Sequence, residues 1–235
     1  MYLEEPLFIV ADGPDGCGKT TLISNRAHHL REDLKQEVVV MKGLGQGRIG
    51  AECRIRHLTS QTGPGFESLI IPISFMEAYY DHVLPALAEG KSVLMDRWVA
   101  CFFAYQVNGR EDLYAKEIYE TLFDRNRTPM VRQPNIYFLG YVDRLVADQR
   151  LKARPEHINY LDQETTEFKD RVVQGYAKFA KQNTGTVQLN CNLSEATVFM
   201  TAKAQIELYL SKQRDAQMAE RRRIANKLQK EAQAQ

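Results

Sequence analysis

The sequence has no closely spaced cysteine pair, no long apolar run and almost no net charge. Its cysteines, Cys17, Cys53, Cys101 and Cys191, are far apart in the chain, which disfavours a zinc site or a C-x-x-C redox motif. Separated cysteines in a chain of this size are typical of reduced thiols, so we expect a cytoplasmic protein. No apolar run approaches the roughly 20 residues of a membrane span. The first residues also lack the basic and apolar regions of a signal peptide, and none is expected.

The net charge of +1 is distributed unevenly. Residues 211–235 contain seven Lys or Arg and three Asp or Glu, so this tail carries +4 and the preceding residues carry −3. We expect residues 1–210 to form one globular domain with a core. The tail is expected to be a solvated or frayed basic helix. The alternative is a contact surface for nucleic acid or an acidic partner.

Apolar runs of strand length alternate with longer helical patterns. The expected strands are Pro6–Ala11, Glu37–Met41, Ser92–Met95, Asn135–Leu139 and Thr186–Leu189. The expected helices are Lys19–Leu34, Phe66–Glu89 with breaks near Pro72 and Pro85, Val99–Gln106, Asp112–Asp124, Asp143–Arg154, Gln163–Gln182 and Ser194–Leu210, while Gly43–Gly50 is expected to be a loop. This alternation predicts an α/β fold in three layers, with a five-stranded parallel sheet, helices on both faces and a basic C-terminal helix. Ligands then bind beyond the carboxyl ends of the strands.

The segment Gly13–Thr20 matches the phosphate-loop pattern G-x-x-x-x-G-K-[ST]. It follows an expected strand and precedes an expected helix, which is the context that supports a P-loop NTPase fold. Its glycines allow backbone N–H groups to approach phosphate oxygens, and the helix dipole favours anions. We expect Lys19 to bridge the β- and γ-phosphates of a nucleoside triphosphate and Thr20 to bind Mg²⁺. The loop by itself does not distinguish ATP from GTP. The predicted ATP site comprises Gly13, Asp15, Gly16, Cys17, Gly18, Lys19, Thr20 and Thr21.

Two further motifs lie downstream of the phosphate loop. Residues 85–98 combine a helical stretch, a strand and Asp96-Arg97-Trp98, and Ala104-Tyr105-Gln106 follows. With these motifs, the chain resembles the thymidylate kinase family of P-loop nucleoside monophosphate kinases from about Leu7 to about Leu210. The resemblance implies transfer of the ATP γ-phosphoryl group to a deoxynucleoside monophosphate, with dTMP giving dTDP and Mg²⁺ as cofactor. It also suggests a homodimer.

The resemblance implies roles for individual residues. Asp15 would meet the sugar 3′-hydroxyl of the acceptor, Asp96 would organise Mg²⁺ and the acceptor phosphate, and Arg97 would bind that phosphate. Lys42 would add positive charge there, in place of the arginine usual in the family, whereas Tyr105 and Gln106 would line the nucleobase pocket. Arg150 and Arg154 lie four residues apart, at the position of the arginine-rich lid, residues 143–162. They would stabilise the transferring phosphoryl group.

The sequence departs from the family at the acceptor site. No arginine occurs between Ile70 and Tyr80, where the family has an aromatic residue followed by a phosphate-binding arginine. Phe75 either stacks on the base or packs in the core. Asp96 and Arg97 alternatively form an ion pair at the end of a strand. The lid arginines alternatively lie on a solvated face of a helix. The departures leave two other functions open. One is a kinase for a modified deoxynucleotide or a base hydroxyl in DNA, and the other is a P-loop regulator or DNA-associated ATPase.

Overall fold

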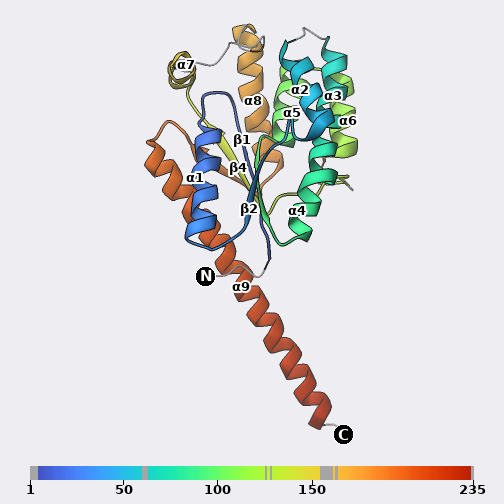
Figure 1. The fold of residues 1–235 in the computed structure, drawn as a ribbon, viewed down its shortest axis with the longest axis vertical. Coiled ribbons are helices and arrows are strands. Elements are labelled where there is room, and N and C mark those ends of the chain that lie inside the picture. The colour runs from blue at the N-terminus through green and yellow to red at the C-terminus, as the bar shows by residue number, and fades with distance from the viewer. Residues whose placement is uncertain are drawn as a thin grey trace.

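The computed structural model describes residues 5–59, 63–124, 126–127, 129–153, 161 and 164–233. These residues contain the predicted five-stranded, wholly parallel sheet (Figure 1). Its strand order is β2-β3-β1-β4-β5. The strands are β1 (Phe8–Asp12), β2 (Val38–Lys42), β3 (Ser92–Asp96), β4 (Ile136–Tyr141) and β5 (Thr186–Asn190). The order places β1 at the centre, so the loop that follows it lies between the ends of β3 and β4.

Helices cover both faces of this sheet. They are α1 (Lys19–Glu32), α2 (Gly47–Thr59), α3 (Pro64–Glu77), α4 (Leu84–Ala88), α5 (Val99–Phe102), α6 (Leu113–Leu122), α7 (Arg144–Lys152), α8 (Thr166–Gln182) and α9 (Glu195–Gln233), with π-helical segments η1 (Ala78–Val83) and η2 (Phe103–Gly109). Alternate residues of β1 enter different cores: Phe8 and Val10 face the side of α3, α5 and α8, whereas Ile9 and Ala11 face α1 and α9. The three-layer α/β prediction is therefore confirmed.

Two local predictions were wrong. The expected loop Gly43–Gly50 includes the start of α2, because the carboxylate of Glu77 accepts hydrogen bonds from the N–H groups of Ile49 and Gly50. A carboxylate from a neighbouring helix thereby caps α2 at its N-terminus. The expected break near Pro72 is absent and α3 continues through this residue. Burial of Ile71 and Phe75 on the same helix offsets the hydrogen bond that proline removes.

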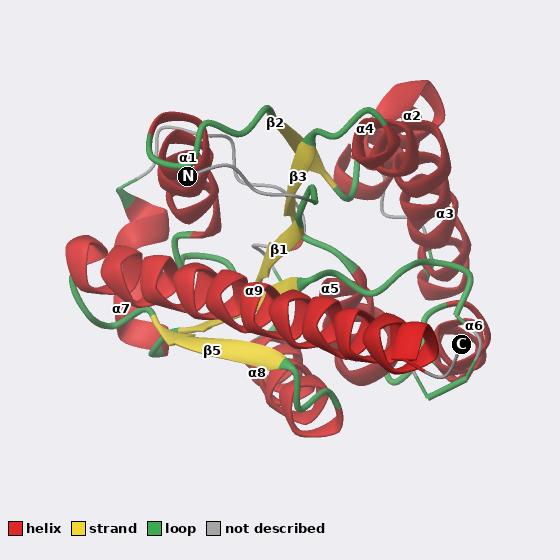
Figure 2. Ribbon diagram, turned by 90° about the horizontal axis from the view of Figure 1, so that it is seen from below, coloured by secondary structure: helices red, strands yellow, loops and turns green. Residues whose placement is uncertain are grey.

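The C-terminal helix α9 packs against α1 and then leaves the body (Figures 1 and 2). The guanidinium of Arg26 lies 3.6 Å from the centroid of the Phe199 ring, and Lys203 forms an ion pair with Asp33 at 2.9 Å. Leu210 is the last buried residue among the described side chains of α9. The helix continues without a break to residue 233. A functional division at residue 210 remains a prediction.

Deleting residues 211–235 is expected to leave the melting temperature almost unchanged, because the described side chains beyond Leu210 bury no core surface. The matched change is Ile206→Ala in the same helix. Ile206 is fully buried, so this substitution should cost about 2–5 kcal/mol. Thermal and denaturant unfolding of both variants provide the measurement. A truncated protein as unstable as the Ile206→Ala variant would contradict this account of α9.

Candidate functional site

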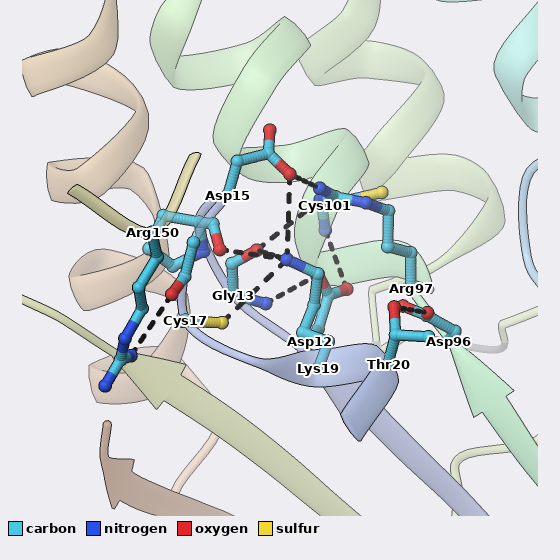
Figure 3. A network of polar contacts seen from close by, with 12 residues as sticks. Asp12, Gly13, Asp15, Cys17, Lys19, Thr20, Asp96, Arg97, Cys101 and Arg150 are labelled. Atoms are coloured by element: carbon cyan, nitrogen blue, oxygen red, sulfur yellow. Dashed lines mark hydrogen bonds and ion pairs between the residues drawn. The ribbon is translucent and has the colours of Figure 1, made fainter. Parts of the chain in front are cut away.

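The candidate site lies at the carboxyl ends of β1 and β3. These strands pair in register, with Ala11 opposite Asp96, and the N–H of Arg97 donates to the carbonyl of Ala11 at 3.0 Å. The phosphate loop after β1 and the Asp96-Arg97 pair after β3 are consequently side by side (Figure 3). Parallel pairing alone brings together two motifs that are far apart in the sequence.

The phosphate loop adopts the conformation that its glycines predict. Gly13, Gly16 and Gly18 all have positive φ, and a Cβ on Gly13 would lie 2.5 Å from the carbonyl oxygen of Gly140. The helix α1 begins within this segment, at Lys19, and Gly18 precedes it without a side-chain cap. The Lys19 ammonium donates to the carbonyls of Gly13 and Pro14, both at 2.9 Å. The first N–H groups of α1 and the lysine charge therefore suit a phosphate group.

Thr20 and Asp96 form a pair of oxygen donors beside the loop. The Thr20 hydroxyl donates to a carboxylate oxygen of Asp96 at 3.0 Å (Figure 3). Among the described residues, no group of three or more His, Cys, Asp or Glu side chains could hold a metal ion. Mg²⁺ commonly needs only one or two protein oxygens when nucleotide phosphates and water supply the others. Thr20 and Asp96 thus fit Mg²⁺ carried by a nucleotide, although not an all-protein metal cage.

Asp15 connects the phosphate loop to Arg97 and Tyr105. Its carboxylate forms an ion pair with Arg97 and accepts a hydrogen bond from the Tyr105 hydroxyl at 2.8 Å. Lys19 lies 3.8 Å from the same carboxylate. Burial opposes the charge on Arg97, but Asp15 beside it keeps the pKa of Arg97 well above its ordinary value. The structure therefore places a permanent positive charge, that of Arg97, in direct contact with a side chain of the phosphate loop.

The expected lid is only partly described. Arg150, in the last turn of α7, donates to the carbonyl of Gly16 at 3.2 Å. The backbone of Ala147 comes so close to Gly16 that a Cβ there would lie 2.8 Å from the Ala147 Cα. Arg154 lies outside the described residues, as does most of the segment that follows α7. One of the two lid arginines is thus in contact with the phosphate loop.

Two residues expected at the acceptor base do not present a free surface. Phe75 is 0% exposed and packs on Trp98, with ring centroids 5.1 Å apart. It also contacts Phe123 across the same core, so Phe75 packs in the core of this structure. Gln106 is likewise 0% exposed, and its amide donates to the buried Glu67 at 3.2 Å. Aromatic packing and a carboxylate partner keep both side chains away from the surface.

Lys42 and Thr21, two further predicted site residues, are exposed. Lys42 ends β2 in register with Asp96, so it lies at the same edge of the sheet as the motif after β3. Thr21 is exposed in the first turn of α1.

Comparison with known proteins places the chain in a family. The sequence model of the thymidylate kinases matches residues 11–202. The chain is 30% identical over 191 residues to the thymidylate kinase of Oenococcus oeni, which covers 80% of this chain and 88% of the relative. The corresponding protein of Limosilactobacillus fermentum is 32% identical over 178 residues, covering 74% and 82%. That of Enterococcus faecalis is 29% identical over 209 residues, covering 86% and 97%.

The chain belongs to the thymidylate kinase family. It is therefore a phosphotransferase that uses ATP and acts on nucleotide monophosphates. The described part of the chain contains no helix that is long and apolar enough to cross a membrane.

One central residue of this kinase was missed by the sequence analysis. Asp12 is 1% exposed at the end of β1, and its carboxylate accepts five hydrogen bonds at 2.8–3.1 Å. The donors are the N–H groups of Gly13, Trp98 and Cys101 and the hydroxyls of Tyr137 and Tyr176. Burial raises the pKa of Asp12, while Arg97 and the backbone donors oppose that rise. The donors come from four separate segments, which is why no sequence motif indicates this role.

The hydrogen bonds to Asp12 stabilise the turn after β3, which contains Arg97. Arg97 has φ of 67°, a left-handed conformation that is unfavourable for a residue with a Cβ. Trp98 and Cys101, which follow it, donate their N–H groups to the same Asp12 oxygen. Gly43 lies against this turn, and a Cβ on Gly43 would overlap the Arg97 carbonyl oxygen. Asp12 therefore acts as a positioning residue for the Arg97 side chain.

Asp12→Asn should lower kcat by at least tenfold while the protein remains folded. An asparagine amide nitrogen cannot accept the hydrogen bonds that one carboxylate oxygen now accepts, and each bond to a charged group is worth about 1.5–3 kcal/mol. The measurement is steady-state kinetics with each nucleotide varied, together with a melting curve. Tyr137→Phe is the control, since it removes one donor and keeps the carboxylate. If the wild type and the Asp12→Asn variant had equal kinetics, Asp12 would contribute to the stability of the protein and not to catalysis.

Proposed function

We propose that this protein transfers the γ-phosphoryl group of Mg²⁺-bound ATP to dTMP, giving dTDP. The observation that carries the proposal is the position of Asp15. This residue belongs to the phosphate loop, yet it pairs with Arg97 and Tyr105, which lie beyond the end of β3. The donor and acceptor sites would share this carboxylate, which fits a transfer between two nucleotides. The curated relatives that are 29–32% identical to this chain are thymidylate kinases.

The donor side would be built from the loop and the start of α1. Lys19 would exchange its two carbonyl partners for the β- and γ-phosphate oxygens, and the loop N–H groups would bind the same phosphates. Thr20 and Asp96 would hold Mg²⁺, which neutralises phosphate charge when bound. Arg150 already contacts the loop through Gly16, and we infer that its guanidinium would act on the transferring group. Arg154 would join it from the lid.

The acceptor side would use the charges at the ends of β2 and β3. Arg97 would bind the acceptor phosphate, and Lys42 would add a second, weaker charge from the neighbouring strand. Asp15 and Tyr105 would then bind sugar hydroxyls. Phosphoryl transfer requires little covalent chemistry from the protein, so fixing the two nucleotides in line and neutralising charge would account for catalysis.

A modified deoxynucleotide is the second candidate acceptor. It is favoured by the complete burial of Phe75, which leaves no exposed ring at the position where the family stacks on thymine. The absence of arginine between Ile70 and Tyr80 points the same way. A hydroxyl within DNA would additionally use the basic residues 211–235.

The decisive experiment offers labelled ATP to a panel of deoxynucleoside monophosphates and to single- and double-stranded DNA. We expect the highest kcat/KM with dTMP. If a modified monophosphate or DNA is labelled in preference to dTMP, that molecule is the acceptor. Hydrolysis stimulated by DNA, without a labelled product, would instead indicate an ATPase or regulator.

Lys19→Ala should reduce transfer to below a few per cent of the wild-type rate, because Lys19 is the ammonium inside the phosphate loop. The melting temperature should change little. The matched control is Lys91→Ala, since Lys91 is half-buried at the opposite end of β3 and its ion pair among the described residues is with Glu89. Substantial turnover in the Lys19→Ala variant would rule out this role for the loop.

Arg97→Ala should raise KM for dTMP at least tenfold and lower kcat, with KM for ATP nearly constant. Removing one member of a charge-assisted pair costs about 1.5–3 kcal/mol. Lys42→Ala should have the same effect more mildly, because lysine is a point charge without a fork. Kinetics with dTMP varied at saturating ATP separate the two sides of the site. An unchanged KM for dTMP in both variants would contradict the proposed acceptor site.

A further inference from the structure

Two buried cysteines that the proposed mechanism does not require meet beneath the phosphate loop. Cys17 lies in the loop and Cys191 directly follows β5, and each is 4% exposed. A Cβ on Gly140 would lie 3.0 Å from both sulfur atoms. The two sulfurs therefore share the space left by the absent Gly140 side chain. The Cys191 thiol itself donates a hydrogen bond to the carbonyl of Leu189 at 3.5 Å.

The surroundings of the two thiols differ. The sulfur of Cys17 lies 3.8 Å from the Lys19 ammonium and just before the N-terminus of α1, and both features favour a thiolate. The neighbouring Cys191 thiol and the Lys19 ammonium lower the pKa of Cys17 to about 6 despite its burial. The neighbouring Cys17 sulfur and burial raise the pKa of Cys191. Cys17 is thus suited to react first, and Cys191 is in place as its resolving thiol.

We propose that Cys17 and Cys191 form a reversible disulfide on exposure to hydrogen peroxide, and that this bond inactivates the phosphate loop. The inference goes beyond the proposed function, because disulfide formation and ATP binding are both measured without an acceptor.

The chemistry proceeds in two balanced steps. The Cys17 thiolate attacks one oxygen of hydrogen peroxide, so an S–O bond forms, the O–O bond breaks, and the departing hydroxide takes a proton and leaves as water. The sulfur of Cys191 then attacks the sulfur of Cys17, so the S–S bond forms, the S–O bond breaks, and hydroxide leaves with the thiol proton as a second water. Two thiols are oxidised and one peroxide is reduced. A dithiol such as dithiothreitol reverses the change by exchange.

Bond formation has a direct consequence for the loop. To form the bond, the two sulfurs that flank the Gly140 Cβ position must close to about 2.05 Å, with a fixed dihedral range. Cys17 lies between Gly16 and Gly18, and the next N–H groups are those proposed to bind phosphate. A displacement of about 1 Å in a catalytic site costs on the order of 100-fold in rate. The disulfide should therefore weaken ATP binding and slow transfer together.

The test treats the full-length protein with a small excess of hydrogen peroxide, blocks free thiols and maps peptides without reduction. We expect a peptide that links Cys17 to Cys191, an ATP affinity at least tenfold lower and a matching loss of transfer. Dithiothreitol should restore all three. Cys191→Ser should keep its basal activity and lose the reversible inhibition, whereas the matched Cys53→Ser variant, altered at a buried cysteine in α2, should behave as the wild type.

Three results would overturn the proposal. They are absence of the linked peptide in the wild type, a linked peptide with unchanged ATP affinity, and reversible inhibition that persists in the Cys191→Ser variant. If serine at this buried position prevents folding, Cys191→Ala preserves the apolar contact and answers the same question. A protein that forms the disulfide and loses ATP affinity, yet does not phosphorylate dTMP, would refute the proposed function and leave this inference intact.

Discussion

The buried carboxylate of Asp12 is the interaction on which the site depends. It lies at the end of the central strand β1 and accepts hydrogen bonds from the phosphate loop, the turn after β3, β4 and α8. A carboxylate without partners at this depth would be strongly destabilising, so the contacts that the four segments make with it stabilise the fold. The same contacts fix the left-handed turn at Arg97. Stability and catalytic geometry are therefore coupled through one side chain.

Parts of the fold and site that are encoded locally could be predicted from the sequence. The strands have apolar runs, and the phosphate loop and Asp96-Arg97 are short motifs, so their position at one edge of the sheet follows from parallel pairing. The structure brings Lys19, Thr20, Asp96 and Arg97 together there. Their catalytic roles remain proposals.

The features that were missed depend on partners far away in the sequence. The start of α2 requires the carboxylate of Glu77, and the burial of Gln106 requires the carboxylate of Glu67. Asp12 directly precedes the phosphate loop, but its donors extend as far along the chain as Tyr176. Periodicity and short motifs contain no information about such contacts, because tertiary packing decides them.

The projection of α9 beyond Leu210 gives the protein an unusual outline (Figure 1). At 1.5 Å per residue, the 23 residues from 211 to 233 form a rod about 35 Å long. A compact body of residues 1–210 has a radius of gyration of only about 17 Å. Attaching such a rod makes tumbling anisotropic. The chain should elute earlier from a sizing column than a sphere of 27.0 kDa, so its apparent mass overstates its true mass even as a monomer.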